Sequence, residues 1–188
     1  IPDYRLHPDV VFPTFVEDAA KAVSWVIDNG DKYGADTSTL FVMGHSAGAH
    51  IAAMLSTDAR FLGAHDVSLQ QLSGFIGLSG PYDFLPLESG YLLDVFPEDQ
   101  RQASQPIQFV SAQMPPTLLI HGSDDDVVDD GNSVRMAERI TSVGGTVTLT
   151  LYDGVGHAAI AAGLSPPLDF ANSTLEDSLT FLDALSGE

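Results

Sequence analysis

One serine in this chain stands in a setting suited to nucleophilic chemistry. The segment Gly44-His45-Ser46-Ala47-Gly48 has the spacing G-x-S-x-G. It follows an apolar run at 40–43 directly and precedes an Ala- and Leu-rich stretch at 47–56. This order predicts a strand, a sharp turn that carries Ser46, and a helix, which is the context that the motif requires. So tight a turn crowds its neighbours, and we therefore expect glycine to be needed at both flanks.

The helix start that follows Ser46 supplies a second element of the chemistry. The first N–H groups of a helix have no partner within it, and the helix dipole favours negative charge there. We therefore expect the Ala47 N–H to donate to the oxyanion that forms when the serine attacks a carbonyl group.

A serine hydroxyl needs a base, and the base needs a carboxylate that orients it. For this motif the chain order is serine, acid, histidine, each at the C-terminal end of a strand. The aspartates at 124–126 follow a strand-like run at 117–120, and His157 follows another at 146–152. Both positions agree with that order, so His157 is the predicted base. Spacing alone leaves open which of the three aspartates is the acid.

Other histidines fit the role of base less well. Adjacent side chains diverge, so His45 is not expected to serve Ser46 as a base, and it is instead a candidate substrate-binding residue. His50 lies four residues after Ser46 on the same predicted helix, where packing or a hydrogen bond near the site is expected. His121 ends a strand just before the aspartates, and we expect it to support the loop that carries the acid.

The acidic run at 124–130 does not predict a metal site. Calcium loops need oxygen ligands at alternate positions, but Val127 and Val128 occupy positions where ligands should be. The chain has no cysteine, which excludes thiolate zinc sites and cysteine nucleophiles. We therefore expect neither a metal nor a cofactor.

Strand-like apolar runs alternate with helix-like periods along the chain. This pattern indicates an α/β fold with a mostly parallel sheet and helices on both faces. The strands are expected at 40–43, 74–78, 117–120 and 146–152. The helices are expected at 15–27, 47–56, 134–143 and 175–182, with capping-box spacing at Thr14 and Ser173. The first three strands are continuous apolar runs, as in strands buried on both faces, whereas the alternation at 146–152 is typical of a strand near the sheet edge.

The region 81–116 departs from this regular alternation. It is rich in proline and contains scattered aromatic residues, which predicts a cap-like excursion from a single domain that covers residues 1–188. We expect the excursion to cover the acyl side of the site, with Tyr82 and Phe84 as candidate substrate-binding residues.

Composition limits the partners of the chain. It has 188 residues, of which 44% are hydrophobic, and 26 acidic against 7 basic residues give a net charge of -19. So negative a surface disfavours nucleic acid and anionic lipid. No apolar run reaches the roughly 18 residues that span a bilayer. A small molecule is the expected partner, a homo-oligomer is left open, and the compartment is not determined, with the cytoplasm favoured.

Together these residues resemble the α/β-hydrolase superfamily, and more narrowly bacterial carboxylesterases related to the hormone-sensitive-lipase and kynurenine-formamidase-like esterases. The matching segments are Tyr4-Arg5-Leu6, Phe12-Pro13, Glu17-Asp18-Ala19, Gly44 to His50, Ser79-Gly80-Pro81-Tyr82-Asp83, His121 to Asp125 and Gly156-His157. The resemblance implies Ser46 as nucleophile and His157 as base. In the family pattern His-Gly-x-x-Asp-x-x-Val the acid is the fifth residue, which implies Asp125.

The resemblance implies serine-dependent hydrolysis of carboxylic esters without a cofactor. Two alternatives remain open: an arylformamidase-type amide hydrolase, and a catalytically impaired hydrolase fold that serves as a binding protein. Relatives carry a His-Gly-Gly-type oxyanion loop before the segment that matches Tyr4, but no Gly-Gly occurs upstream of Ser46. We therefore expect the C-terminal two-thirds of a hydrolase domain, lacking the N-terminal strands. An exposed strand edge and the absence of the second oxyanion donor would follow.

Overall fold

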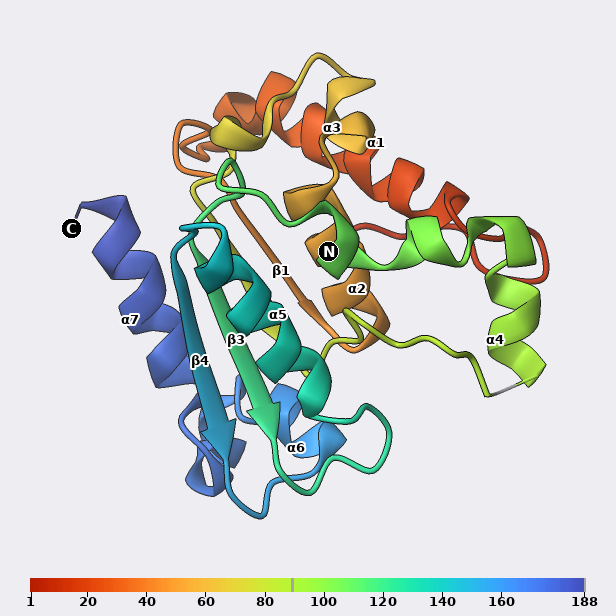
Figure 1. The fold of residues 1–188 in the computed structure, drawn as a ribbon. Coiled ribbons are helices and arrows are strands. Elements are labelled where there is room, and N and C mark those ends of the chain that lie inside the picture. Colours follow the sequence, from red (N-terminus) through yellow and green to blue (C-terminus); the bar gives the residue numbers. More distant parts are fainter. Residues whose placement is uncertain (89, 188) are drawn as a thin grey trace.

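Four parallel strands form the sheet at the centre of the computed structural model, which describes residues 1–88 and 90–187 (Figure 1). The strands are β1 (Phe41–His45), β2 (Gly74–Leu78), β3 (Thr117–Gly122) and β4 (Val147–Tyr152). They lie side by side in chain order, and each neighbouring pair is parallel. The predicted α/β fold and its parallel sheet are confirmed. β4 lies at an edge, as its alternating sequence predicted.

Seven α-helices and several short 3₁₀ turns connect and cover the strands in the described part of the chain. The helices are α1 (Thr14–Asn29), α2 (Ala47–Thr57), α3 (Ala59–Gly63), α4 (Gly90–Val95), α5 (Gly131–Ser142), α6 (His157–Ala162) and α7 (Thr174–Ser186). The 3₁₀ turns are Gly30–Tyr33, Leu69–Gln71, Glu98–Gln100, Gln102–Ser104, Pro106–Phe109 and Pro166–Ala171. The four predicted helices correspond to α1, α2, α5 and α7, whereas α6 was not predicted.

Helices cover both faces of the sheet, as predicted. Successive side chains of a strand point to opposite faces. Phe75 and Leu119 therefore pack with α2 and α5 on one face. Ile76 and Leu118 pack with α6 and α7 on the other. In Figure 1, α5 and α7 lie on opposite sides of β3 and β4. Both layers hold the C-terminal ends of the strands at one edge, where the sequence places the candidate site.

The two edge strands are less buried than the central ones. Every residue of β2 and β3 is buried, whereas Met43 in β1 is 42% exposed. The expectation that the strand at 40–43 is buried on both faces is therefore wrong, because β1 lies at the edge of the sheet.

A further apolar cluster lies between α1, α2 and the excursion at 81–116. It contains Phe12 and Phe15 from the N-terminal side and Phe96, the residue after α4. α1 packs mainly on α2 and α3. The excursion is therefore anchored to α2, the helix that follows Ser46.

The two predicted capping boxes do not form. α1 begins at Thr14 with Pro13 at the N-cap, and α7 begins after Ser173; neither N-cap residue makes a side-chain capping bond. Burial of the apolar faces of these helices is therefore sufficient to position them.

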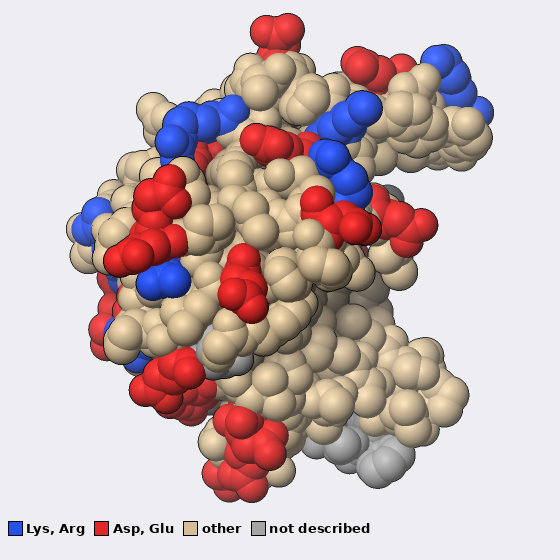
Figure 2. All heavy atoms as spheres, turned by 90° about the vertical axis from the view of Figure 1, so that its right-hand side faces the viewer, with Lys and Arg blue, Asp and Glu red and all other residues tan. Residues whose placement is uncertain are grey.

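Acidic side chains are scattered over the face shown in Figure 2, with basic groups close to several of them. Three arginines pair with aspartates: Arg5 with Asp18, Arg60 with Asp58, and Arg135 with Asp83. In the described ranges, no helix combines the length and the apolar character needed to cross a membrane.

Candidate active site

The G-x-S-x-G segment forms a sharp turn between β1 and α2. Ser46 has φ 56° and ψ −120°, in a region that residues with a side chain rarely adopt. Its N–H donates to the Leu78 carbonyl at 2.9 Å, which fixes the turn against the end of β2. A Cβ atom at Gly44 would overlap the Gly48 carbonyl, whereas a Cβ at Gly48 would meet no atom within 4 Å. The predicted need for glycine is thus confirmed at Gly44 and wrong at Gly48.

The predicted base and acid are joined by a short hydrogen bond. His157 is the first residue of α6, and Asp125 lies in the loop between β3 and α5. The Nδ1 atom of His157 lies 2.7 Å from Oδ2 of Asp125. The other carboxylate oxygen, Oδ1, accepts from the N–H groups of Val127 at 3.0 Å and Val128 at 2.9 Å. Both oxygens of Asp125 therefore have fixed partners.

The same contacts determine the charge of Asp125. Burial by itself would raise the pKa of this carboxyl group. Hydrogen bonds from the Val128 N–H, the His157 ring and the Val127 N–H, with a smaller effect of the Ser79 hydroxyl, outweigh burial and lower the pKa below its ordinary value. Asp125 is therefore ionised at neutral pH and accepts a hydrogen bond from the Nδ1–H of His157, which leaves Nε2 as the free ring nitrogen.

His45 contacts the base directly. Its ring lies 4.5 Å from the His157 ring, centroid to centroid, and its Nε2 lies 3.0 Å from the His157 carbonyl oxygen. Because a carbonyl only accepts, Nε2 of His45 carries a proton and donates. Burial lowers the pKa of His45, which favours this neutral form. His45 thus holds the start of α6 next to the turn, whereas its expected contact with substrate stays a prediction.

The link between Ser46 and His157 is not formed as a hydrogen bond. Within residues 1–88 and 90–187, no partner is present for the Ser46 hydroxyl. Such contacts are often long before substrate binds. The contact between His45 and His157 nevertheless places the base beside the residue that precedes the serine.

The position of Tyr82 does not agree with the substrate-binding role predicted for it. Its side chain is fully buried, and its ring packs edge-on against Phe75. A Cβ atom at Gly77 or at Gly80 would overlap the tyrosine ring or its hydroxyl. The two glycines therefore leave the space that the Tyr82 ring fills, which makes this side chain part of the core.

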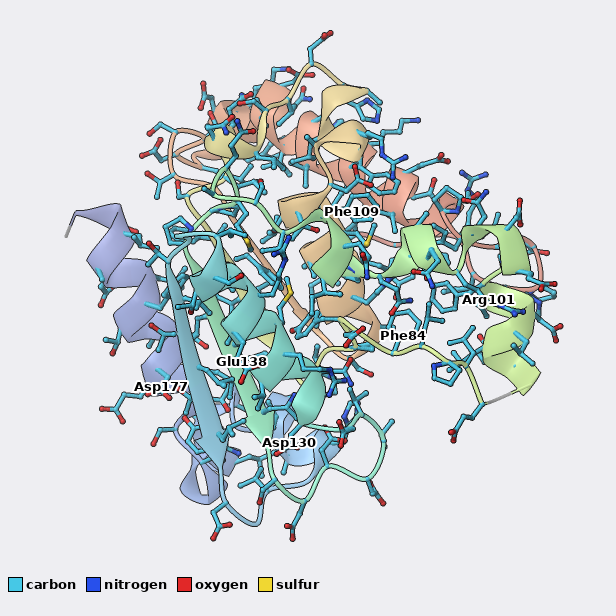
Figure 3. The ribbon with its side chains drawn as sticks, viewed as in Figure 1. Phe84, Arg101, Phe109, Asp130, Glu138 and Asp177 are labelled. Carbon is cyan, nitrogen blue, oxygen red and sulfur yellow. The ribbon has the colours of Figure 1, made fainter. Side chains whose placement is uncertain are left out.

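Phe84 lies in the excursion and packs against the apolar cluster between α1, α2 and the excursion (Figure 3). Its ring is 5.5 Å from the ring of His50 and 5.3 Å from that of Phe96. Phe84 is only half-buried, so part of its surface is open to a ligand. Its role in substrate binding stays a prediction. His50 itself is buried and bonds the Ser104 carbonyl at 2.7 Å, as expected of a packing residue.

Two residues near Asp125 extend the sequence-based description of the site. His121 lies 3.2 Å from the Asp125 carboxylate, in agreement with its expected support of the acid loop. Ser79 was not predicted: it is fully buried at the end of β2, with φ 48°. Nothing in the sequence pattern distinguished Ser79 from a serine that only packs.

A metal ion has no evident site here. No three His, Asp or Glu side chains of the described residues are grouped so that they could hold one.

Residues 1–140 match the model of the protein family BD-FAE. The chain belongs to this family. Curated proteins similar to this BD-FAE chain include a probable isoprenylcysteine alpha-carbonyl methylesterase of Arabidopsis thaliana, 31% identical over 178 residues, which cover 82% of this chain and 37% of that protein. Esterase LipC of Mycobacterium tuberculosis is 31% identical over 180 residues, which cover 82% of this chain and 43% of LipC. The BD-FAE chain thus spans less than half the length of these relatives.

Solved structures show that the fold of this BD-FAE chain is shared with esterases. A truncated carbohydrate esterase from gut microbiota superimposes with a TM-score of 0.84 at 20% identity, covering 99% of this chain and 73% of the other. Thermogutta terrifontis esterase 2 phosphonylated by sarin gives 0.81 at 23% identity, with coverage of 97% and 70%. The predicted α/β-hydrolase fold and superfamily are confirmed.

Proposed function

We propose that this BD-FAE chain carries the nucleophile, base and acid of a serine carboxylesterase. The observation that carries the proposal is the bond of 2.7 Å between His157 Nδ1 and the buried carboxylate of Asp125, at the strand edge where Ser46 lies. The similarity to ester hydrolases supports the same chemistry. A histidine paired with an ionised acid, beside a turn that carries a serine, is the set of groups that acyl transfer needs.

In the proposed reaction Ser46 Oγ attacks the ester carbonyl carbon, and Nε2 of His157 takes the hydroxyl proton. His157 then protonates the leaving alcohol. Asp125 keeps the other ring nitrogen protonated and stabilises the imidazolium that forms. Water, activated by the same base, then attacks the acyl-enzyme, and the carboxylic acid product leaves as the proton returns to Ser46 Oγ. The side chain of His157 is 13% exposed, so a water molecule can reach the ring.

The Ala47 N–H is the proposed oxyanion donor within this chain. Ala47 is the first residue of α2 and is exposed, so its N–H is free for a ligand. Hydrolases of this fold use a second backbone donor, and we expect it from a His-Gly-Gly-type loop outside residues 1–188. Loss of one such donor typically lowers the rate by about 10² to 10³.

Steady-state hydrolysis by the full-length protein tests this proposal. Short-chain p-nitrophenyl esters are compared with an N-formyl arylamine. We expect ester hydrolysis that falls by about 10³ or more in Ser46→Ala. Ser142→Ala is the matched control, because Ser142 is exposed and its hydroxyl bonds only the Arg139 carbonyl; it should keep full activity.

Three outcomes would contradict the proposal. Preference for the N-formyl arylamine would indicate the amide hydrolase. No turnover of either substrate class would favour a binding protein. Activity that survives in Ser46→Ala would show that another residue is the nucleophile.

A further inference from the structure

A second histidine contacts the carboxylate that the base uses. Oδ2 of Asp125 lies 2.7 Å from Nδ1 of His157 and 3.2 Å from Nε2 of His121. His121 comes from β3, and its side chain is completely buried. The proposed mechanism assigns no step to His121.

The neighbours of His121 determine which ring nitrogen carries the proton. Nε2 hydrogen-bonds with the Val128 carbonyl at 2.9 Å, and Asp125 Oδ2 lies close by, at 3.2 Å, as a charge contact. Neither oxygen can donate, because the pKa of Asp125 is lowered and the carboxyl is ionised. Nε2 of His121 is therefore the protonated nitrogen. Nδ1 is then the acceptor, and Ser133 Oγ lies 2.7 Å from it.

Ser133 has no exposed surface and lies in the first turn of α5, three residues after Asp130, which Figure 3 labels. A hydroxyl that donates to Nδ1 polarises the imidazole ring, and this strengthens donation by Nε2–H on the opposite side. The contacts thus form a continuous path from Ser133 through His121 and Asp125 to His157.

We propose that His121 and Ser133 act as a positioning pair that holds the Asp125 carboxylate and moderates its attraction for the Nδ1 proton of His157. This inference rests on the proposed function, because it assigns the pair a role through the base. His121 and Ser133 touch no reacting atom and are not catalytic residues.

The proposed role predicts the direction in which the pH profile of the enzyme shifts when the pair is removed. The polarised Nε2–H of His121 lies 3.2 Å from Oδ2, although its hydrogen bond goes to the Val128 carbonyl, and its positive partial charge offsets part of the negative charge that stabilises the imidazolium of His157. Without this group the imidazolium is more stable, so the base loses its proton only at higher pH. The acidic limb of the kcat/KM profile should therefore move to higher pH.

Other groups around Asp125 could also affect its charge. The titratable or hydroxyl-bearing side chains near it are His45 after β1, Ser79 after β2, His121 in β3, His157 in α6, and Asp124 and Asp126 in its own loop. All of them are unchanged when only Ser133 is replaced, apart from the ring polarisation of His121.

The decisive experiment is the pH profile of kcat/KM for ester hydrolysis by the full-length protein. His121→Phe should move the acidic limb to higher pH by about 0.5 to 1 pH unit. Ser133→Ala should move it in the same direction by less. His121→Gln places an amide nitrogen near the Nε2 position and should bring the limb back toward the wild-type position. His65→Phe, in the turn after α3 and away from the site, is the matched control and should leave the limb in place.

The variants also separate positioning from simple structural support. A residue that only supports the fold would lower kcat/KM at every pH and leave the limb unmoved. Ser133→Ala removes a single oxygen atom, so it tests the proposal even where His121→Phe does not fold. The proposed positioning role would be overturned if the acidic limb stays at the same pH in Ser133→Ala. It would also be overturned if the limb moves to lower pH in any variant that folds.

A second readout does not depend on activity. Nitrogen-15 NMR of labelled histidine in the wild-type protein should show His121 with Nε2 protonated and Nδ1 as an acceptor. A protonated Nδ1 would contradict the inference even if the enzyme is active. If the wild-type protein shows no turnover, the proposed function fails, whereas this spectrum still decides whether the His121 contacts are as described.

Discussion

The buried histidine of α2 leads to a quantitative prediction about acid stability. His50 is 3% exposed, and its Nε2 donates to the Ser104 carbonyl at 2.7 Å. Aromatic rings surround it, namely Phe12, Phe15, Phe84 and Phe96. Burial lowers the pKa of His50 to about 4, and the hydrogen bond to the Ser104 carbonyl opposes this only in part.

The size of the effect follows from the difference between the folded and unfolded states. The pKa of His50 is about 4 when folded, against 6.5 for the free side chain. Only the unfolded chain takes up this proton between these values. The stability that a neutral His50 provides is therefore complete above pH 6.5, decreases as the pH falls, and is lost below about pH 4. A shift of this size corresponds to about 3 kcal/mol.

Urea unfolding of the full-length protein, followed by circular dichroism from pH 7 to pH 4, measures this loss. The comparison is with His50→Gln, whose amide can still donate to the Ser104 carbonyl but does not titrate in this range. Other carboxylates and histidines contribute to both proteins and cancel in the difference. We expect the advantage of the wild type over the variant to decrease by about 3 kcal/mol across the range. A difference that stays constant with pH would refute the reasoning.

Two further predictions concern local packing. Gly44→Ala should lower the free energy of unfolding by about 2 kcal/mol or more, because its Cβ would overlap the Gly48 carbonyl, whereas Gly48→Ala should change it by less than about 1 kcal/mol. Thermal unfolding of the two variants tests this contrast, and equal destabilisation would contradict it. Tyr152→Phe removes the bond of 2.6 Å from the tyrosine hydroxyl to Asp177 in α7, and should cost about 1 kcal/mol with unchanged ester hydrolysis. A loss of activity in Tyr152→Phe without a loss of stability would show that the contact serves the site instead.

The central elements were predictable because local sequence and tertiary burial agree in them. The apolar runs that became β2 and β3 are buried on both faces. The alternation that became β4 matches an edge strand. Ser46 lies at the predicted turn because the run before it has the length of a buried strand and the Ala-rich stretch after it favours a helix.

The environment of the acid was less predictable, because it depends on contacts distant in sequence. Ser133 is twelve residues from His121, and no spacing rule connects a helix hydroxyl to a strand imidazole. Tyr82 was misassigned because an aromatic residue in an irregular segment resembles a pocket residue, whereas the space at Gly77 that it fills is visible only in three dimensions. The contact of His45 with the start of α6 was not predicted, since α6 itself was not predicted.

The account depends most on Ser46 being an activated nucleophile. Intact-mass and peptide analysis of the full-length protein after treatment with a fluorophosphonate tests this directly. We predict one adduct per chain, located on Ser46, that is absent in Ser46→Ala and greatly slowed in Asp125→Asn. A wild-type protein that stays unmodified, or that carries the adduct on another residue, would contradict the account.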